Sequence, residues 1–256
     1  MKDKEKCKTI IVLDCDGTIL DTVGPSQEII KILAKEFDII LPNDNDPKFK
    51  NSWGTGGYSL IKLYFPNYNP KLVHRRWKKL EKSMKIYLIN GVEETVKKLK
   101  EFGFIVGLVT NRSWKSLKWY KKLWKPLNFD FIQTSEYNRL HKIIPTLNPF
   151  KKRLTTKYFK PNPKAFEHLI KMLKKQDIIP QKIICVDDTL AGFEAVFWAN
   201  FRVKPQLKFV GVLTGPLKSK QEWYEQARAQ AYIKKKFPVI SSIAELPNWL
   251  EKENIK

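Results

Sequence analysis

The sequence has few cysteines and no long apolar run. Cys7, Cys15 and Cys185 are its three cysteines, and no two of them have C-x-x-C spacing. Such an odd set does not indicate a disulfide framework or a cysteine-held metal site. No apolar run approaches the ~20 residues that a membrane-spanning helix needs. The charged start before the first apolar run does not resemble a signal peptide. We therefore expect a cytoplasmic protein with reduced thiols and no membrane association.

Acidic residues are also scarce. The chain has 26 Asp and Glu against 48 Lys and Arg, a formal net charge of +22. Lysine pairs fall on expected helix faces throughout the chain, at Lys78-Lys79, Lys97-Lys98, Lys121-Lys122 and Lys174-Lys175. This dispersal favours a solvated basic surface over one binding patch. The three histidines, His74, His141 and His168, are scattered and predict no metal cluster.

Apolar residues, in contrast, are plentiful. They make up 43% of the 256 residues, which is enough for a sizeable buried core. Short apolar runs alternate with amphipathic segments, and this alternation is typical of βαβ units. We predict an α/β fold in which helices flank a Rossmann-like parallel sheet.

Two of the scarce acids follow the first apolar run directly. Ile10–Leu13 predicts a short buried strand, and Asp14-Cys15-Asp16-Gly17-Thr18 comes next. Ligands bind at the carboxyl edge of open α/β sheets. Asp14 and Asp16 point to the same side of a straight strand, and a cation such as Mg²⁺ would offset their repulsion. A solvated turn is the alternative. The segment Leu13–Thr18 resembles the first motif of the haloacid dehalogenase superfamily.

Three further segments resemble the other motifs of that family, in the same order. Phe104–Val109 predicts a buried strand, and the Thr of the following Thr110-Asn111-Arg112 is either a phosphate ligand or a helix N-cap. Lys160-Pro161-Asn162-Pro163 opens a predicted helix and resembles the third motif. Lys182–Val186 predicts a strand that leads into an acidic pair, Asp187-Asp188, as in the fourth motif.

The resemblance is to the phosphoglycolate phosphatase and β-phosphoglucomutase-like branch, and it implies the chemistry. Asp14 would attack phosphorus and form an aspartyl-phosphate, and Asp16 would act as general acid and base. The implied ligands of Mg²⁺ are Asp14, Asp16 through its backbone carbonyl, and the acidic pair, with Asp188 favoured over Asp187.

The same resemblance implies how the phosphate is held. Thr110, Asn111 and Lys160 are the expected phosphate-binding residues, and Gly17 and Thr18 support the first motif. Lys160 is also expected to keep Asp14 ionised.

The segment from Leu20 to Leu88 differs from the rest of the chain because it does not alternate between strand and helix patterns. Its apolar residues have helical spacing. We predict a core formed by residues 1–19 and 89–256, with a small helical cap, residues 20–88, inserted after the first strand. Such a cap closes over the site and excludes water. Residues 52–57 are either a cap loop that faces the site or an ordinary turn between helices.

A second unusual segment is residues 137–159, predicted to be a basic insertion loop within the core. No Asp or Glu occurs from Tyr137 to Phe166, whereas basic and aromatic residues accumulate there. The loop either meets a polyanionic substrate, such as a nucleotide or a nucleic-acid end, or is a tolerated surface insertion.

Taken with the resemblance, these features predict a Mg²⁺-dependent phosphatase that hydrolyses a small phosphorylated metabolite or nucleotide. Dehalogenases and phosphonatases of the family lack the acid found at Asp16. A sugar-phosphate mutase keeps it and stays an alternative, although Thr18 favours a phosphatase. A nucleic-acid-binding protein, including a nucleic-acid end phosphatase, is the alternative suggested by the basic surface.

Overall fold

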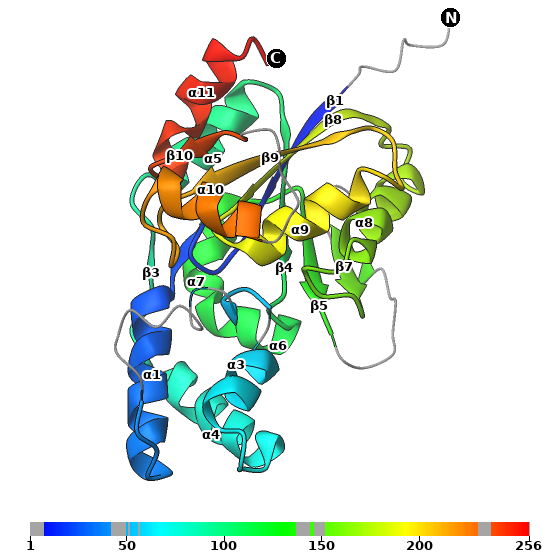
Figure 1. Ribbon diagram of the computed structural model, residues 1–256. Coiled ribbons are helices and arrows are strands. Elements are labelled where there is room, and N and C mark those ends of the chain that lie inside the picture. The colour runs from blue at the N-terminus through cyan, green and yellow to red at the C-terminus, as the bar shows by residue number, and fades with distance from the viewer. Residues whose placement is uncertain are drawn as a thin grey trace, which may run out of the picture.

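The computed structural model describes residues 8–41, 50, 52–55, 57–136, 144–145, 152–229 and 237–255. These residues form an eight-stranded sheet with the order β10-β9-β8-β1-β4-β5-β7-β6 (Figure 1). Neighbouring strands are parallel, except that β6 runs antiparallel to β7. The strands are β1 (Lys8–Leu13), β4 (Ile105–Thr110), β5 (Phe131–Ser135), β6 (Ile144–Pro145), β7 (Lys152–Thr156), β8 (Pro180–Asp187), β9 (Leu207–Val212) and β10 (Val239–Ile240). The predicted α/β fold with a parallel sheet is confirmed.

Strand β1 lies in the interior of the sheet because its residues are apolar on both faces. Ile10 to Leu13 are all buried, as expected of a strand covered by helices on both sides. Val12 lies between Gly107 of β4 and Cys185 of β8. The carboxyl ends of β1, β4 and β8 therefore meet at one edge of the sheet, with Asp14 and Thr110 at their tips.

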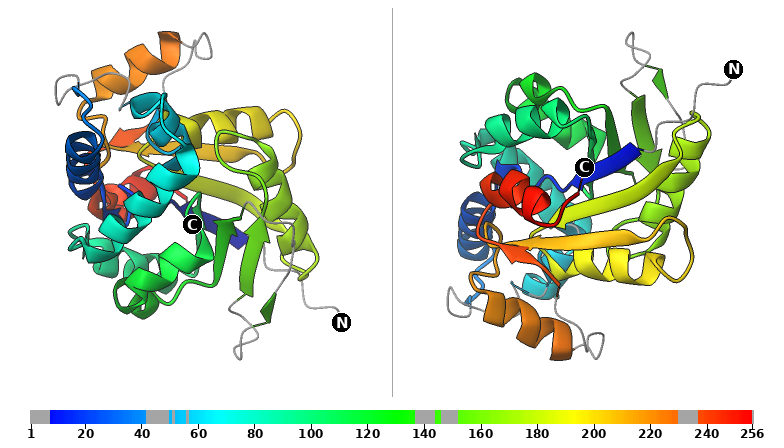
Figure 2. Two further views of the ribbon diagram at one scale, coloured as in Figure 1. Left: turned by 90° about the horizontal axis from the view of Figure 1, so that it is seen from below. Right: turned by 90° about the horizontal axis from the view of Figure 1, so that it is seen from above.

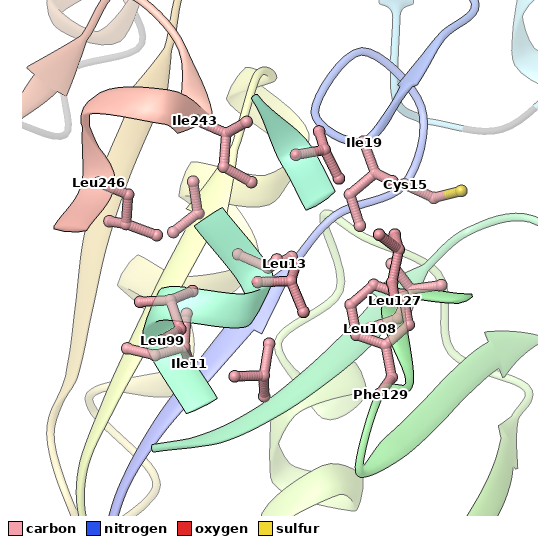
Figure 3. Close-up of a cluster of buried hydrophobic side chains, with 14 of the residues drawn as sticks. Ile11, Leu13, Cys15, Ile19, Leu99, Leu108, Leu127, Phe129, Ile243 and Leu246 are labelled. Atoms are coloured by element: carbon pink, nitrogen blue, oxygen red, sulfur yellow. The ribbon is translucent and has the colours of Figure 1, made fainter. Parts of the chain in front are cut away.

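Helices cover both faces of the sheet (Figure 2). On one face, Ile11 and Leu13 pack with Leu99, Ile243 and Leu246 (Figure 3). The helices that contribute to this face are α5 (Val92–Glu101), α6 (Trp114–Leu117), η1 (Lys118–Tyr120), α7 (Lys121–Trp124), η2 (Lys125–Leu127), η3 (Ile243–Glu245) and α11 (Leu246–Lys252). On the other face, Ile10 and Val12 pack against α8 (Lys164–Lys174), α9 (Leu190–Ala199) and α10 (Lys220–Ala229).

Three further helices lie beyond the carboxyl edge of the sheet (Figure 1). These are α1 (Val23–Glu36), α3 (Gly57–Tyr64) and α4 (Pro70–Ser83), and they share a hydrophobic cluster of their own. Helix α4 begins with Pro at its first position, and the Asn69 side chain accepts a hydrogen bond from the backbone N–H of Lys71, a combination that favours a helix start. The chain leaves and re-enters the core through a short antiparallel ribbon, β2 (Leu20–Asp21) with β3 (Tyr87–Leu88). Cap boundaries at residues 20 and 88 remain a prediction.

Part of the predicted basic insertion loop, residues 137–159, is a strand and not a loop. Residues 152–156 form β7, which pairs with β5 in the register Gln133 to Leu154. Leu154 and Thr156 are buried, and threonine is enriched in strands. Residues 137–143 and 146–151, which include Arg139, His141, Lys142 and Lys151, lie outside the described residues.

Among the described residues, none of the helices has the length and apolar character needed to cross a membrane.

Candidate active site

The first motif makes a tight turn at the end of β1. The backbone N–H of Asp14 still donates to the carbonyl of Val186, at 2.9 Å, and the carbonyl of Cys15 then accepts from the N–H groups of Ile19 and Leu20. Gly17 has a φ of +81°, and a Cβ there would lie 2.1 Å from Oδ2 of Asp188. Glycine is therefore required for both the backbone conformation and the close approach. The turn holds Asp14 at 6% exposure.

Lys160 connects the first and fourth motifs. Its Nζ donates to Oδ1 of Asp14 and to Oδ2 of Asp187, each at 2.6 Å, and lies 3.3 Å from the carbonyl oxygen of Val109. The residue is 2% exposed. One buried lysine thus contacts residues from β1, β4 and β8 at the edge where these strands end.

The acidic pair Asp187-Asp188 is held by separate partners. Asp187 accepts from Lys160 and, through Oδ1, from the N–H and hydroxyl of Thr189 at 2.9 and 2.6 Å. Thr189 is also the N-cap of α9. Asp188 accepts from Thr18 Oγ1 and from Trp53 Nε1, both at 3.1 Å. Trp53 comes from the segment 52–57, so this segment faces the site, as in the cap-loop alternative.

The three buried carboxylates fit a divalent cation. Asp14, Asp187 and Asp188 each offer an oxygen within 4.8 Å of the others. When all three are ionised, their summed charge is −3. The Lys160 ammonium contributes +1, so the net charge of the four side chains is −2. Carboxylate oxygens are ligands that Mg²⁺ prefers. A Cβ on either Gly17 or Gly215 would lie 2.1 Å from Oδ2 of Asp188, so glycine at both positions is what leaves space for the Asp188 carboxylate itself.

Burial determines the protonation of these acids when no cation is bound. It raises the pKa of Asp14 to about 7, although the Lys160 ammonium acts in the opposite direction. Burial, together with the nearby charges of Asp187 and Asp14, raises the pKa of Asp188 well above its ordinary value. The expectation that Lys160 keeps Asp14 ionised is therefore not met by Lys160 alone, because desolvation outweighs the attraction of one ammonium shared between two carboxylates.

Asp16 faces away from this cluster and pairs with Arg112. Arg112 donates to Oδ2 of Asp16 from Nε at 3.0 Å and to Oδ1 from Nη2 at 2.5 Å. Burial disfavours the Asp16 carboxylate, but the guanidinium prevails, and the pKa of Asp16 lies below its ordinary value. The carboxylate of Asp16 is thus ionised and turned towards the cap.

Arg112 also contacts the cap, an arrangement that sequence reasoning missed. Its Nη1 pairs with Glu81 of α4, its guanidinium lies 5.0 Å from the centre of the Tyr120 ring, and the Tyr120 hydroxyl donates to the carbonyl of Glu81. The sequence of α4 did contain an indication of this contact. Val73, Trp77 and Glu81 follow one another at four-residue spacing and lie on the buried side of the helix. A lone acid on an apolar helix face indicates a buried partner of opposite charge.

The two other predicted phosphate ligands differ in their present contacts. Thr110 is buried, and its Oγ1 accepts from the backbone N–H of Arg112 at 3.0 Å. The Asn111 amide is engaged with backbone groups: Nδ2 donates to the carbonyls of Gly54 and Lys160, and Oδ1 accepts from the N–H of Lys160 at 2.7 Å. Asn111 therefore fixes Lys160 and the cap loop relative to each other.

A cavity of about 170 Å³ lies between the cap helices and the core, with Asp16 and Arg112 on its core side. The cap contributes aromatic and charged side chains. Its lining includes Trp53, Tyr58, His74, Trp77, Lys78 and Glu81 on the cap side, together with Phe159. The charges alternate, because Lys78 pairs with Glu81 at 2.7 Å and Glu81 pairs with Arg112.

The four motif segments thus converge on one buried acidic site, and the family comparison agrees with this arrangement. The family model for haloacid dehalogenase-like hydrolases matches residues 11–204. The chain belongs to this family. A comparison with curated proteins gives no match.

Solved structures of haloacid dehalogenase-like proteins resemble the chain over almost its whole length. One such hydrolase from Bacteroides fragilis has a TM-score of 0.68 at 16% identity and covers 93% of this chain and 99% of its own. A protein assigned as a β-phosphoglucomutase from Bacteroides vulgatus has a TM-score of 0.65 at 17% identity, and the match covers 97% of this chain and 90% of that protein. A predicted phosphoglycolate phosphatase from Haemophilus somnus has a TM-score of 0.64 at 17% identity, and the match covers 96% of this chain and 99% of that protein. At these identities the likeness shows the fold.

Proposed function

We propose that this protein is a Mg²⁺-dependent phosphomonoester hydrolase that forms an aspartyl-phosphate on Asp14. The observation that carries the proposal is the contact of Lys160 with both Asp14 and Asp187, beside Asp188. When all three acids are ionised, this leaves two uncompensated negative charges in a buried site at the carboxyl edge of the sheet. A divalent cation and a bound phosphate together suit that charge pattern.

Asp14 is the proposed nucleophile. Attack by one of its oxygens on phosphorus forms the O–P bond as the bond to the leaving oxygen breaks, and water later hydrolyses the acyl phosphate. Mg²⁺ bound between Asp14, Asp188 and the backbone carbonyl of Asp16 would offset the negative charge shared by nucleophile and phosphate. Asp187 would serve mainly to hold Lys160, since its oxygens already accept from Lys160 and Thr189.

Asp16 is the proposed general acid and base. Its paired, ionised form is suited to taking a proton from the water that hydrolyses the intermediate. The proton that Asp16 takes from water in the second step is the one that it gives to the leaving group in the first step of the next turnover, and holding this proton requires Arg112 to give up one of its two contacts with Asp16. Thr110 and Lys160 would bind the transferring phosphoryl oxygens, where charge accumulates.

A sugar-phosphate mutase is the second candidate, because Asp16 is retained and one similar structure is assigned as a β-phosphoglucomutase. The two functions differ in the acceptor of the phosphoryl group, which is water in one and a second sugar hydroxyl in the other. The substrate in either case would be a small phosphorylated metabolite or a nucleotide.

The deciding experiment measures phosphate release from a phosphomonoester panel with Mg²⁺ or with EDTA. Wild type is compared with Asp14→Asn and with Asp21→Asn, a matched change at an exposed acid outside the cluster. Release that needs Mg²⁺, disappears in Asp14→Asn and persists in Asp21→Asn supports the phosphatase. Interconversion of sugar phosphates without net release supports the mutase. Turnover that survives in Asp14→Asn contradicts both.

A further inference from the structure

A second charged surface lies away from the candidate active site. It is a hollow of about 520 Å³ between the C-terminal half of α8 and the connection from α9 to β9. We refer to it as the basic hollow. Its lining residues are Glu167, Ile170, Lys171, Lys174, Lys175, Arg202, Val203 and Lys204. Five of these eight residues are cationic and one is acidic.

The basic hollow and the candidate active site lie at opposite edges of the sheet. Residues 167–175 come shortly before β8 begins, and residues 202–204 come shortly before β9 begins, whereas Asp187 ends β8. Strand β8 has 8 residues, a length of about 25 Å. Figure 1 shows α8 and the end of α9 beside each other at this edge. A ligand in the basic hollow therefore does not contact Asp14.

The charge in the basic hollow is largely uncompensated. Lys171, Lys174 and Lys175 are exposed and share one helix face through their three- and four-residue spacing. Arg202 pairs with Glu167 at 3.2 Å. Among the residues that the structure describes, no carboxylate forms an ion pair with Lys171, Lys174, Lys175 or Lys204. Like charges gathered in this way repel one another, and a polyanion would relieve the repulsion.

Two exposed aromatic rings come shortly before Arg202 in the chain. Phe201 directly precedes Arg202 and is 71% exposed, and Trp198, on the last turn of α9, is 39% exposed. The two ring centres are 5.8 Å apart. A large apolar ring left in water beside a cationic hollow is the combination that single-stranded nucleic acids bind, through phosphate neutralisation and base stacking.

We propose that the basic hollow binds single-stranded nucleic acid, with its lysines on the phosphates and Phe201 stacked on a base. This site is independent of the proposed phosphatase activity. It also revises the expectation from sequence that the lysines are simply dispersed, since the pair Lys174-Lys175 lies with Lys171 of the same helix and with Arg202 and Lys204 of one other segment.

The first test measures binding of a fluorescent single-stranded oligonucleotide of about 12 nucleotides by anisotropy between about 50 and 200 mM salt. The variant of the basic hollow, here the hollow variant, is Lys171→Ala/Lys174→Ala/Lys175→Ala. The matched control is Lys121→Ala/Lys122→Ala/Lys125→Ala, three exposed lysines on the opposite face with the same change in net charge. We expect only the hollow variant to lose affinity, by at least about tenfold. In a plot of log Kobs against log salt concentration, its slope should be less steep than that of wild type by about 2.

The second test separates base stacking from phosphate binding. Phe201→Ala is expected to weaken binding about tenfold or more, whereas Phe102→Ala, a 42% exposed ring at the end of α5, leaves it unchanged. Unchanged thermal melting and hydrolysis of p-nitrophenyl phosphate show that each variant is folded.

Four outcomes would overturn the proposal: no binding at low salt; equal losses in the two lysine variants; full affinity in Phe201→Ala; or equally tight binding of duplex DNA or anionic lipid vesicles.

Discussion

Lys160 compensates two carboxylates in a place that water does not reach. Its Nζ lies 2.6 Å from both Asp14 and Asp187, and the three side chains are 3–7% exposed. Removal of one partner from a buried ion pair leaves an uncompensated charge, at a cost of about 3–5 kcal/mol. A single substitution at Lys160, Asp14 or Asp187 is therefore expected to change the stability of the protein.

We expect Lys160→Ala to lower the free energy of unfolding by about 3 kcal/mol at pH 8, because two buried carboxylates then lose their shared cation. The loss should shrink near pH 5, where Asp14, with a pKa of about 7, is protonated. Urea denaturation at both pH values measures this. Lys97→Ala, at an exposed lysine of α5, is the control, and an equal loss in that variant would contradict the explanation.

The pKa of Asp14 also predicts how stability depends on pH when metal is absent. Its pKa is about 7 in the folded protein and 3.8 ordinarily, so the folded state binds the proton more tightly than the unfolded state. The contribution of Asp14 is then favourable at low pH and is lost as pH rises from about 4 through 7. Asp14→Asn should gain stability relative to wild type over this window.

Denaturation in EDTA at several pH values checks this expectation. Asp21→Asn should follow the wild-type curve. A constant difference between wild type and Asp14→Asn at all pH values would mean that Asp14 is already ionised in the folded protein.

At the scale of elements, Arg112 joins α4 of the cap to the segment after β4. It contacts Asp16 of the first motif and Glu81 of α4 at the same time, with its side chain 8% exposed. The cap is thus attached to the core covalently through the β2–β3 ribbon and non-covalently through this ion pair, in addition to the hydrogen bonds of Trp53 with Asp188 and of Gly54 with Asn111.

Glu81→Gln is expected to destabilise the protein by about 1–3 kcal/mol, because Arg112 and Lys78 lose a shared carboxylate in a buried setting. Glu36→Gln removes an exposed ion pair with Arg76 between α1 and the same α4 and should have little effect. Denaturant unfolding of both variants tests the contrast. Similar losses in both would show that the position of the pair does not matter.

The elements could be predicted from sequence where the signal is local. The run Ile10–Leu13 is apolar throughout, so a buried strand follows, and parallel strands bring the residues after their carboxyl ends together. Asp14, Lys160 and the acidic pair meet for this reason; their catalytic roles remain predictions. Strand β7 was missed because Leu154 is the one large apolar residue in its sequence, and the pairing of Arg112 with Glu81 depends on how the cap sits on the core.

At the scale of the whole molecule, a strongly basic chain encloses an acidic site. Sequence segments as distant as residues 14 and 188 supply that site, because the sheet order places β1 between β4 and β8. The net charge of +22 is therefore no guide to the charge of the site.

Mg²⁺ should raise the melting temperature of the whole protein, since a cation that binds the folded state stabilises it by RT ln(1 + [L]/Kd), or about 2.7 kcal/mol at 100 times Kd. Asp188→Asn should abolish the shift and Asp21→Asn should retain it. Differential scanning calorimetry with Mg²⁺ or EDTA measures both. An undiminished shift in Asp188→Asn would place the cation elsewhere.

The hydrogen bond from Trp53 to Asp188 has a thermodynamic consequence. The indole of a cap residue donates to Oδ2 of Asp188, one of the oxygens available to a cation. Cation loading and this cap contact then compete for the same atom, and linkage makes the competition reciprocal. Loss of the Trp53 contact is therefore expected to increase the affinity for the cation, and the cation is expected to weaken the contact between Trp53 and Asp188 to the same extent.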